Sequence, residues 1–390
     1  MCEIGSEKDY DLGRSFFFTF YLWLKKKICN MKYIRTYETE EKFLTDKDST
    51  SRGFRLKPTL YKYSEAGDHI HLEIDDPRKH GDSTYMEITL DSDVEFSFYI
   101  GNKSGDTQTT MTCTIDWGDG TVETKTITKD DKGFKLSHSY VAGSYKIELY
   151  GVERGYRVVG DVKNWKCLIS HSSSVKRVVL GNSVGSVGNY TFKSCTSLTS
   201  VHIPEGVTSI GNGVFILCSS LTSIHIPESV TRIWDSAFKS CTSLTSINIP
   251  ESVNSIGGSA FYNCTSLKSI YIPESVTSIE SGAFNQCSSL TSINIPKRVT
   301  SIREGTFYQC SSLTSINIPE SVTSIRAQAF EWCSALISIS SLNTTAPTLD
   351  SYNVFYNLPT DGILHIKPGA TGYDAWLSKL PSGWTIVEDL

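Results

Sequence analysis

A repeat of 23 residues, running from about residue 175 to residue 339, constrains this chain more than any other feature of its sequence. One unit reads Leu-x-x-Ile-x-Ile-Pro, then Val-x-x-Ile, then Ala-Phe-x-x-Cys. Three residue types recur at this spacing: Phe192, Phe215, Phe238, Phe261, Phe284, Phe307 and Phe330; Cys195, Cys218, Cys241, Cys264, Cys287, Cys310 and Cys333; and Pro204, Pro227, Pro250, Pro273, Pro296 and Pro319. A fixed period of this length predicts a solenoid with one coil per repeat.

A single repeat cannot be stable alone, because its few apolar side chains do not offset the entropy of ordering the chain. Stacking on neighbouring coils therefore has to complete the core. Within one repeat, residues 221–226 alternate as a short strand with Leu221, Ile224 and Ile226 facing inward. Pro227 ends this strand, and a return leg follows. The segment around each Phe and Cys is expected to be a turn or a single helical turn.

These residues resemble the BspA-like, or Treponema-type, leucine-rich repeats of bacterial and protist surface proteins. The resemblance covers about half of the chain and rests on the Leu, Ile, Pro, Val, Phe and Cys positions given above. It implies a curved, right-handed solenoid of about seven repeats that is used for adhesion or protein binding. It also implies a location at the cell surface or outside the cell.

Residues 58–160 alternate as β-strands, at 85–90, 94–100, 112–117, 122–128 and 144–149. The run from Asp116 to Thr121, followed by His138 to Tyr140 and Gly143 to Ile147, resembles a PKD domain. Many members of that family have W-x-F where this chain has Asp116-Trp117. The resemblance implies an immunoglobulin-like β-sandwich that acts as a spacer or interaction module. The expected fold class is therefore mainly β, a PKD-like sandwich followed by a leucine-rich repeat solenoid with end caps.

Two carboxylates in the PKD-like motif, Asp116 and Asp119, could suggest calcium. The acidic residues at alternating positions and the closing Glu of an EF-hand loop are missing here. We favour a tight turn in which each Asp bonds its own backbone. His138 is expected to be a packed residue of the sandwich rather than a catalyst.

The expected domain division is a tail or linker at 1–57, the sandwich at 58–160, an N-terminal cap at 161–174, the solenoid at 175–342 and a C-terminal cap at 343–390. An apolar run at 16–24 is followed by three lysines, which is not the order of a secretory signal. We favour a tail outside the fold, or translation from Met31, over a membrane anchor. A cytoplasmic or virion-associated location stays open.

Composition excludes several classes of function. The net charge of −5 argues against nucleic acid as the main partner. No apolar run has the roughly 18–20 residues of a transmembrane span. Seven of the 11 cysteines belong to the repeat and are expected to be buried structural thiols. The sequence contains no C-x-x-C pair, nucleophile elbow, P-loop or H-E-x-x-H motif, so we expect no enzyme, metal or cofactor.

Two surfaces of the solenoid are candidates for binding. The outward positions of the strand leg carry His202, His225, Asn248, Lys268, Tyr271, Asn294 and Asn317. Aromatic residues at positions that vary between repeats are Trp234, Tyr262, Tyr308 and Trp332. The polar strip suits hydrogen bonding with a protein or a glycan, although a merely soluble β-face would look the same. The aromatics could anchor a partner or pack against the neighbouring coil.

These features predict a non-catalytic adhesion or protein-binding protein whose solenoid contacts a protein or glycan ligand. A structural component of a virion or surface assembly is the alternative, favoured by the lack of a convincing signal peptide. An accessory binding module for an enzyme system ranks below both.

Overall fold

The computed structural model describes residues 55–56, 74–75, 84–101, 110–128, 134–150, 156–158, 169–182 and 184–390. The chain forms two compact units, Met1–His80 and Gly81–Leu390. In the first unit, β1 (Arg55–Leu56) pairs antiparallel with β2 (Ile74–Asp75). The predictions for the apolar run at 16–24 and for a start at Met31 lie outside the described residues.

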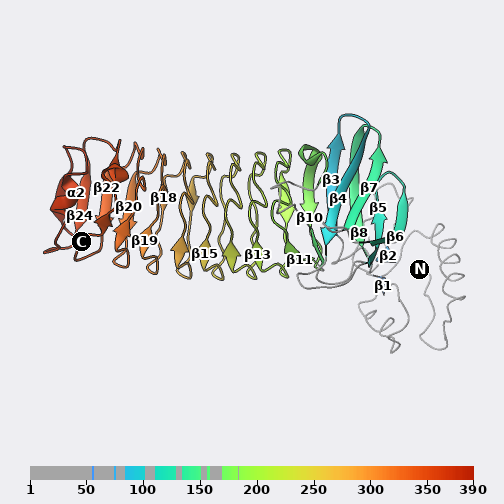
Figure 1. Cartoon of the computed structure of the whole chain (residues 1–390), viewed down its shortest axis with the longest axis horizontal. Helices are drawn as coiled ribbons and strands as arrows, with labels where there is room; N and C mark the ends of the chain where they lie inside the picture. Colours follow the sequence, from blue (N-terminus) through green and yellow to red (C-terminus); the bar gives the residue numbers. More distant parts are fainter. Residues whose placement is uncertain are drawn as a thin grey trace, which may run out of the picture. The chain divides into compact units, whose positions relative to one another are not determined.

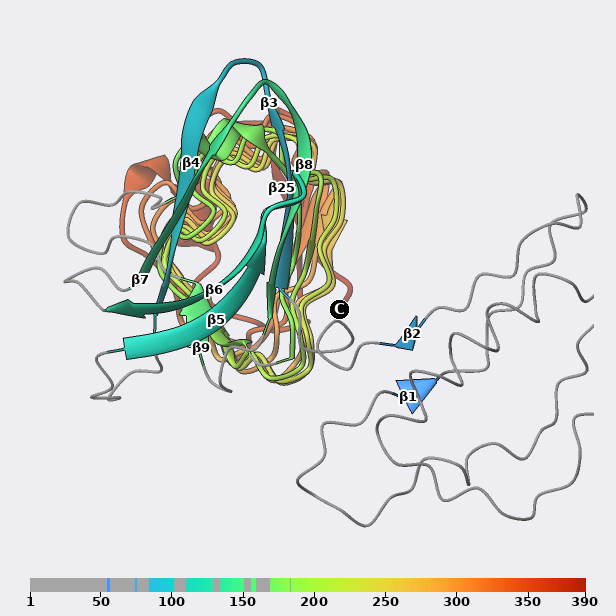
Figure 2. The ribbon, with the colours of Figure 1, turned by 90° about the vertical axis from the view of Figure 1, so that its right-hand side faces the viewer.

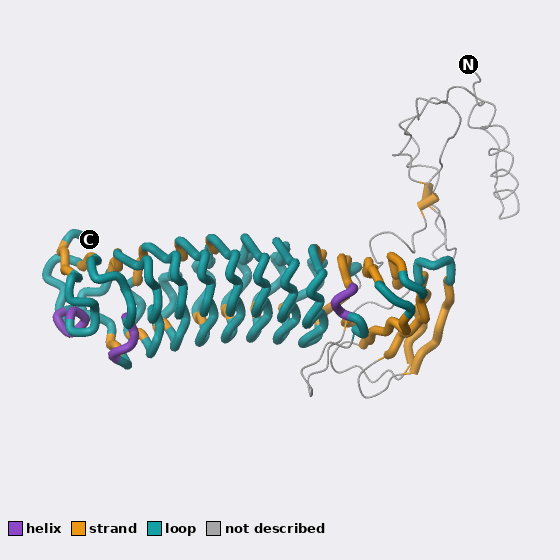
Figure 3. The backbone as a smooth tube through the Cα atoms, turned by 90° about the horizontal axis from the view of Figure 1, so that it is seen from above, coloured by secondary structure: helices purple, strands orange, loops and turns teal. Residues whose placement is uncertain are grey.

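The repeats form a solenoid of stacked coils, as Figure 1 shows along its length and Figure 3 from above. Each coil has two legs that pair in parallel with the same legs of its neighbours. The strands of the first leg are β10 (Val175–Val179), β12 (Ser200–His202), β16 (Ser269–Ile270), β18 (Ser292–Ile293), β20 (Ser315–Ile318), β22 (Ser338–Ser341), β24 (Ile363–Ile366) and β25 (Thr385–Glu388). Those of the second leg are β11 (Val184–Val187), β13 (Ser209–Ile210), β14 (Arg232–Ile233), β15 (Ser255–Ile256), β17 (Ser278–Ile279), β19 (Ser301–Ile302), β21 (Ser324–Ile325) and β23 (Thr348–Leu349).

The register of the coils follows the sequence period. Ile233 of β14 lies opposite Ile256 of β15, which in turn lies opposite Ile279 of β17, so that partners are 23 residues apart. The coils at 221–226 and 244–249 lack a regular strand on the first leg, yet Leu221 and Leu244 are fully buried as in their neighbours. The predicted mainly β solenoid is therefore confirmed.

A column of stacked phenylalanine rings fills the centre of the coils. From Phe192 to Phe330, neighbouring rings have centroids 5.4–5.9 Å apart and planes within 14° of parallel. Phe355 continues the column at 6.0 Å from Phe330 although it lies 25 residues further along the chain. Trp376 ends it with a tilted contact at 5.3 Å from Phe355. The inward orientation expected for these phenylalanines is confirmed.

The cysteines of the repeat are buried and form a second column beside the rings. Each thiol from Cys218 to Cys333 donates a hydrogen bond to the carbonyl oxygen of the Phe 26 residues earlier, with Sγ–O distances of 3.1–3.2 Å. A small side chain with a weak donor fits this position between two coils. The prediction of buried thiols in the repeat is confirmed for all seven.

Ionisation of these thiols should make the solenoid less stable in alkaline solution. Burial raises the pKa of Cys264 from an ordinary 9.0 to about 12, and it also raises the pKa of Cys241, Cys287, Cys310 and Cys333. Because the folded-state pKa is raised, the stabilisation is complete below pH 9 and is lost as the pH rises towards 12. Each such thiol should remove about 1.4 kcal/mol of stability per pH unit in that range.

Urea unfolding of the native chain and of Cys264→Ser between pH 7 and 10.5 checks this prediction. The serine hydroxyl keeps a donor but does not ionise, so the variant should lose less stability with rising pH. Equal slopes for the two proteins above pH 9 would show that the thiol at 264 is not protected from ionisation.

The turn that carries Phe and Cys alternates between left- and right-handed backbone. The residue two places before each repeat Phe and the residue two places after it both have positive φ, as at Gly213 (58°) and Leu217 (62°) around Phe215. The N–H groups of these three residues donate to carbonyl oxygens of the next coil, at Asp235, Ala237 and Lys239. Of the two forms that the sequence allowed, the structure has the turn. Its peptide groups bond between coils rather than within one.

The N-terminal part of the second unit is a two-layer β-sandwich (Figure 2). Its strands are β3 (Thr84–Leu90), β4 (Val94–Gly101), β5 (Thr110–Asp116), β6 (Val122–Thr128), β7 (Phe134–Tyr140), β8 (Gly143–Tyr150) and β9 (Tyr156–Val158). One sheet has the order β3-β8-β5-β6 and the other β9-β4-β7. The rings of Phe98 and Trp117 meet between the layers at 6.4 Å. All five strands predicted from the sequence are present, whereas β7 and β9 were not predicted as strands.

Both sheets of the sandwich continue into the solenoid without interruption. Strand β3 pairs antiparallel with β10, and β9 pairs parallel with β11. The sandwich thus supplies backbone partners to both legs of the first coil and covers its end. Within the segment 161–174, expected to form the N-terminal cap, the structure describes 169–174, including the buried Ile169 and the 3-10 helix η2 (Ser172–Ser174).

The C-terminal end of the solenoid is closed by two tryptophans. The 3-10 helix η3 (Tyr352–Phe355) and the short helix α2 (Asp374–Leu377) carry the last rings of the aromatic column. The indole N–H of Trp376 donates to the carbonyl of Pro347 at 2.9 Å, and that of Trp384 donates to Pro359 at 2.8 Å. Helices in the described part of the chain have at most a few residues, and none could span a membrane.

Candidate ligand-binding groove

The polar residues predicted as a strand-leg binding face lie in one strip along the first leg of the coils. His202, His225, Asn248, Lys268, Tyr271 and Asn317 are exposed on this strip. Asn294 is half-buried, because its amide accepts from the N–H of Ile272 at 2.8 Å and donates to the carbonyl of Ile272 at 2.6 Å. This side chain therefore replaces backbone pairing between two coils.

The four predicted aromatic anchors do not form one site. Trp234 is half-buried beneath the Arg232 guanidinium, 3.8 Å from its ring centroid. The Lys239 ammonium lies 4.6 Å from the ring centroid of the half-buried Tyr262, and Tyr308 is half-buried as well. Trp332 differs from these three, since 41% of it is exposed.

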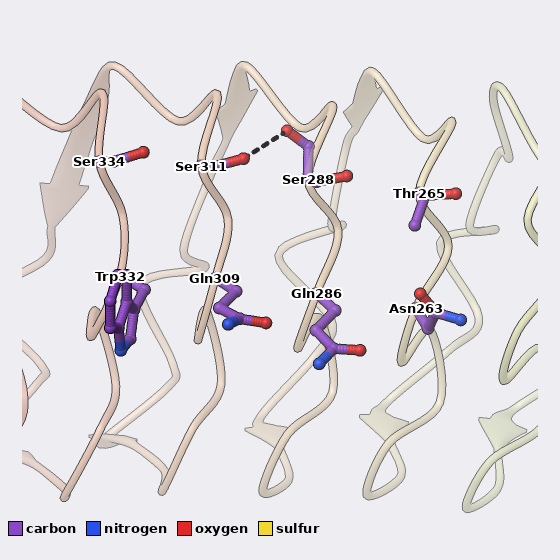
Figure 4. Close-up of a pocket in the computed structure, with 8 residues that line it drawn as sticks. All are labelled: Asn263, Thr265, Gln286, Ser288, Gln309, Ser311, Trp332 and Ser334. Atoms are coloured by element: carbon purple, nitrogen blue, oxygen red, sulfur yellow. Dashed lines mark hydrogen bonds between the residues drawn. The ribbon is translucent and has the colours of Figure 1, made fainter.

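Trp332 forms one end of an open groove of about 380 Å³ on the turn side of the coils (Figure 4). Four successive coils line it, and each contributes one residue to each of two rows. The lower row in Figure 4 holds Asn263, Gln286, Gln309 and Trp332, and the upper row holds Thr265, Ser288, Ser311 and Ser334.

The repeat explains why these side chains meet. Members of the lower row are the second residue after a buried Phe, and members of the upper row directly follow a buried Cys. Because Phe and Cys are fixed inside each coil, the residues between and after them have to project from the turn. Stacking then places equivalent positions side by side, and the Ser311 hydroxyl donates to the Ser288 carbonyl at 3.3 Å across two coils.

Backbone conformation sets the lower row apart. Asn263, Gln286, Gln309 and Trp332 have φ of 58°, 62°, 57° and 63°. Glycine, and to a lesser degree Asn, adopts this left-handed region readily, whereas other L-residues pay roughly 1–2 kcal/mol. Gln and Trp are therefore retained here at a cost in stability.

The chemistry of the lining is uniform. Every side chain is an amide, a hydroxyl or an indole, and none carries a charge. Amides and hydroxyls can both donate and accept hydrogen bonds. At the end of the groove, Trp332 meets the ring of Tyr356 edge-on, with centroids 6.2 Å apart. The groove therefore offers alternating donors and acceptors next to one aromatic surface.

Sequence reasoning selected only Trp332 from this groove. Asn263 and Gln309 fall at positions that vary between repeats, but aromatic neighbours were preferred as anchors. The overlooked signal was an amide at the same repeat position in three successive coils, at Asn263, Gln286 and Gln309, with an aromatic residue next.

In the sandwich, the two carboxylates considered for calcium bond their own turn. Asp116 accepts from the N–H of Gly118 and Asp119 from the N–H of Thr121, both at 2.9 Å. The His138 ring stacks on Trp117 with centroids 4.9 Å apart, and its Nε2 lies 2.7 Å from Asp119 Oδ2. Partial burial opposes ionisation of Asp119, but the hydrogen bonds from His138 and Thr121 prevail and lower its pKa. These contacts agree with the turn and the packed histidine favoured from the sequence.

Metal ligands are not gathered anywhere in the described ranges: no group of three or more His, Cys, Asp or Glu side chains is placed to hold an ion.

The sequence of the solenoid matches a known family model, described as the BspA type leucine rich repeat region, over residues 169–288 and 254–361. Residues 169–361 belong to the BspA-type leucine-rich repeat family. The groove thus lies within the leucine-rich repeat region. The matched residues begin after the sandwich, so the PKD-like assignment of that domain stays a prediction.

Several solved structures are similar to the leucine-rich repeat region. The T. pallidum leucine rich repeat protein TpLRR is 32% identical over 46% of this chain and 82% of its own, with a TM-score of 0.42. A leucine rich cell surface protein from Faecalibacterium prausnitzii is 22% identical over 60% and 86%, with a TM-score of 0.30. The pneumococcal vaccine antigen PcpA is 16% identical over 55% and 68%, with a TM-score of 0.38. A comparison with curated proteins gave no match.

Proposed function

We propose that this chain is a non-catalytic adhesion or binding protein, and that the groove of its leucine-rich repeat region is the contact surface for a protein or glycan partner. The observation that carries the proposal is the groove itself, in which four coils present eight uncharged polar or aromatic side chains on one open surface. Other parts of the solenoid surface present a flat strip without a hollow.

The composition of the groove supports binding rather than catalysis. Amides, hydroxyls and an indole do not exchange protons near neutral pH, so this set provides no general acid or base. A hydroxyl nucleophile would need a neighbouring base to activate it, and the lining holds no His, Lys or carboxylate.

The sandwich would serve as a PKD-like module that holds the solenoid and caps its first coil. The resemblance to surface-protein repeats places the whole chain at the cell surface or outside the cell in this proposal. Continuous pairing of β3 with β10 and of β9 with β11 favours a module that is fixed to the solenoid.

Charge substitutions test the contact surface. The full chain is applied to protein and glycan arrays, and Gln309→Glu is compared with Thr245→Glu on the exposed strand leg. An ionised carboxylate in the neutral groove should weaken binding at least tenfold, whereas the strand-leg variant should bind like the native chain. Loss of binding in Thr245→Glu alone would move the contact to the strand leg, and the lack of any partner would refute the proposed function.

A second candidate, a structural part of a surface assembly or virion, is favoured by the C-terminal end of the solenoid. Strand β25 ends the sheet β20-β22-β24-β25. Ile363, Val387 and Leu390 on or beside its last two strands are 37–42% exposed. Edge strands of this kind can pair with another chain. Light scattering of the purified chain discriminates, because concentration-dependent assembly that Val387→Lys abolishes would support this candidate over the first.

A further inference from the structure

We infer that the groove binds a neutral, extended glycan chain that lies along the solenoid axis, with one sugar ring against Trp332. This inference rests on the proposed function and specifies the class of its ligand. Four observations on the groove carry it, namely its charge, its spacing, its aromatic end and its backbone strain.

The lining matches the functional groups of a sugar. A sugar hydroxyl donates one hydrogen bond and accepts others, and the amides of Asn263, Gln286 and Gln309 offer both roles side by side. The hydroxyls of the upper row add four more groups of the same kind. A charged ligand such as an acidic peptide, a phosphate or a uronic acid would find no opposite charge on these residues.

The spacing of the coils matches an extended sugar chain. The phenylalanine rings beneath the groove are 5.4, 5.9 and 5.5 Å apart from Phe261 to Phe330, and the groove residues advance by the same step from coil to coil. A pyranose ring in an extended β-linked chain advances by a similar distance. One ring per coil would therefore place successive sugars over equivalent amides, and four coils would hold a tetrasaccharide.

Trp332 provides the surface on which a ring can stack. It is 41% exposed, and its edge-on contact with Tyr356 limits its rotation. The C–H face of a pyranose is apolar and packs on the face of an indole, while the equatorial hydroxyls stay in the polar row. Large, rigid aromatic side chains contribute contact area at a low cost in conformational entropy.

The strained backbone points to retention of these side chains for a ligand. In the coils of Phe284 and Phe307, the first left-handed position is glycine, Gly282 and Gly305. The second left-handed position in the same two coils is Gln286 and Gln309. The chain thus uses glycine at one such position and keeps a long amide at the other, which faces the groove. Strain of this kind is concentrated at functional sites.

The strain also gives a test in which folding and binding separate. Gln286→Gly and Gln309→Gly remove the amides and relieve the left-handed strain, so thermal midpoints should be unchanged or higher. Ser240→Gly is the matched control, because Ser240 has φ of 60° at the same repeat position but lies outside the groove. Trp332→Ala removes the aromatic surface at an unchanged backbone conformation.

The probes are cellotetraose, mannotetraose and chitotetraose as neutral β-linked chains, maltotetraose as a bent α-linked chain, and tetragalacturonate as an anionic one. Binding to the full chain is measured by calorimetry. We expect at least one neutral β-linked probe to bind, with tenfold or greater loss in Gln309→Gly and in Trp332→Ala and no loss in Ser240→Gly. Maltotetraose and tetragalacturonate should bind at least tenfold more weakly.

Two outcomes would overturn the inference. One is the lack of binding by every neutral β-linked probe, and the other is binding that both groove variants leave unchanged. If the arrays meanwhile identify a protein whose binding Gln309→Glu abolishes, the proposed function stands and the groove is a protein interface. If neither glycan nor protein binds, the proposed function fails together with the inference.

Discussion

Replacing Phe261 with alanine is expected to lower the free energy of unfolding by about 3–5 kcal/mol. Phe261 is fully buried, with the rings of Phe238 and Phe284 each 5.4 Å away and nearly parallel to it. Truncation removes contacts on both sides at once and leaves a cavity between three coils. The surrounding backbone cannot collapse into this cavity, because hydrogen bonds from Phe238 and Phe261 to the following coils, at Ala260 and Ala283, fix the turn.

Urea or thermal unfolding of the purified chain, followed by circular dichroism, measures this effect. Thr245→Ala is the control, because Thr245 is exposed on the strand leg and its hydroxyl bonds only the carbonyl of Thr222, at 3.2 Å. The control should change stability by less than about 0.5 kcal/mol, as is usual for surface substitutions. If both variants unfolded at the same midpoint, the assignment of buried and exposed positions would be wrong.

Removing the sandwich should have an effect of similar or larger size. A chain that begins at residue 160 lacks β3, β4 and β9, which supply the backbone partners of β10 and β11. Val175, Val178 and Leu180 of the first coil, all at most 1% exposed, would lose their cover on one side. At roughly 1.5–3 kcal/mol per apolar side chain, the loss should reach about 5 kcal/mol or more.

The comparison is made with a chain that begins at residue 81, so that both proteins lack the first unit. The shorter chain should unfold at lower urea concentration and associate through its uncovered coil, because terminal coils need a capping unit. Hydrogen exchange should locate the loss in β10 and β11. A shorter chain that is as stable and as monomeric as the longer one would show that the sandwich is only a spacer.

Much of the fold could be predicted from the sequence, because the period fixes which residues face inward. Phe and Cys recur at positions that one coil geometry serves, and each repeat confirms the others. Strand β9 escaped prediction because Tyr156–Val158 has no alternating pattern and owes its conformation to β4 and β11, which are distant in sequence. Phe355 falls out of the period, yet it stacks on Phe330 through a longer loop.

The groove could not be predicted in the same way. Its walls depend on left-handed backbone at Gln286 and Gln309, which sequence preference alone would assign to glycine or asparagine. Aromatic residues suggested anchors, but Trp234 and Tyr262 lie under Arg232 and Lys239 of their own or the preceding coil. Only stacking decides which variable positions share a surface and which are covered.

The uniform bonding between coils also limits how a chain of this kind can change in length. Each turn donates three N–H groups to the next coil and presents equivalent carbonyls to the one before, so any two coils are interchangeable partners. Loss or gain of a complete 23-residue unit would leave every remaining partner in place, whereas a shift of one residue would misalign all of them. Genetic duplication could therefore lengthen the groove by one coil at a time without redesign of the rest.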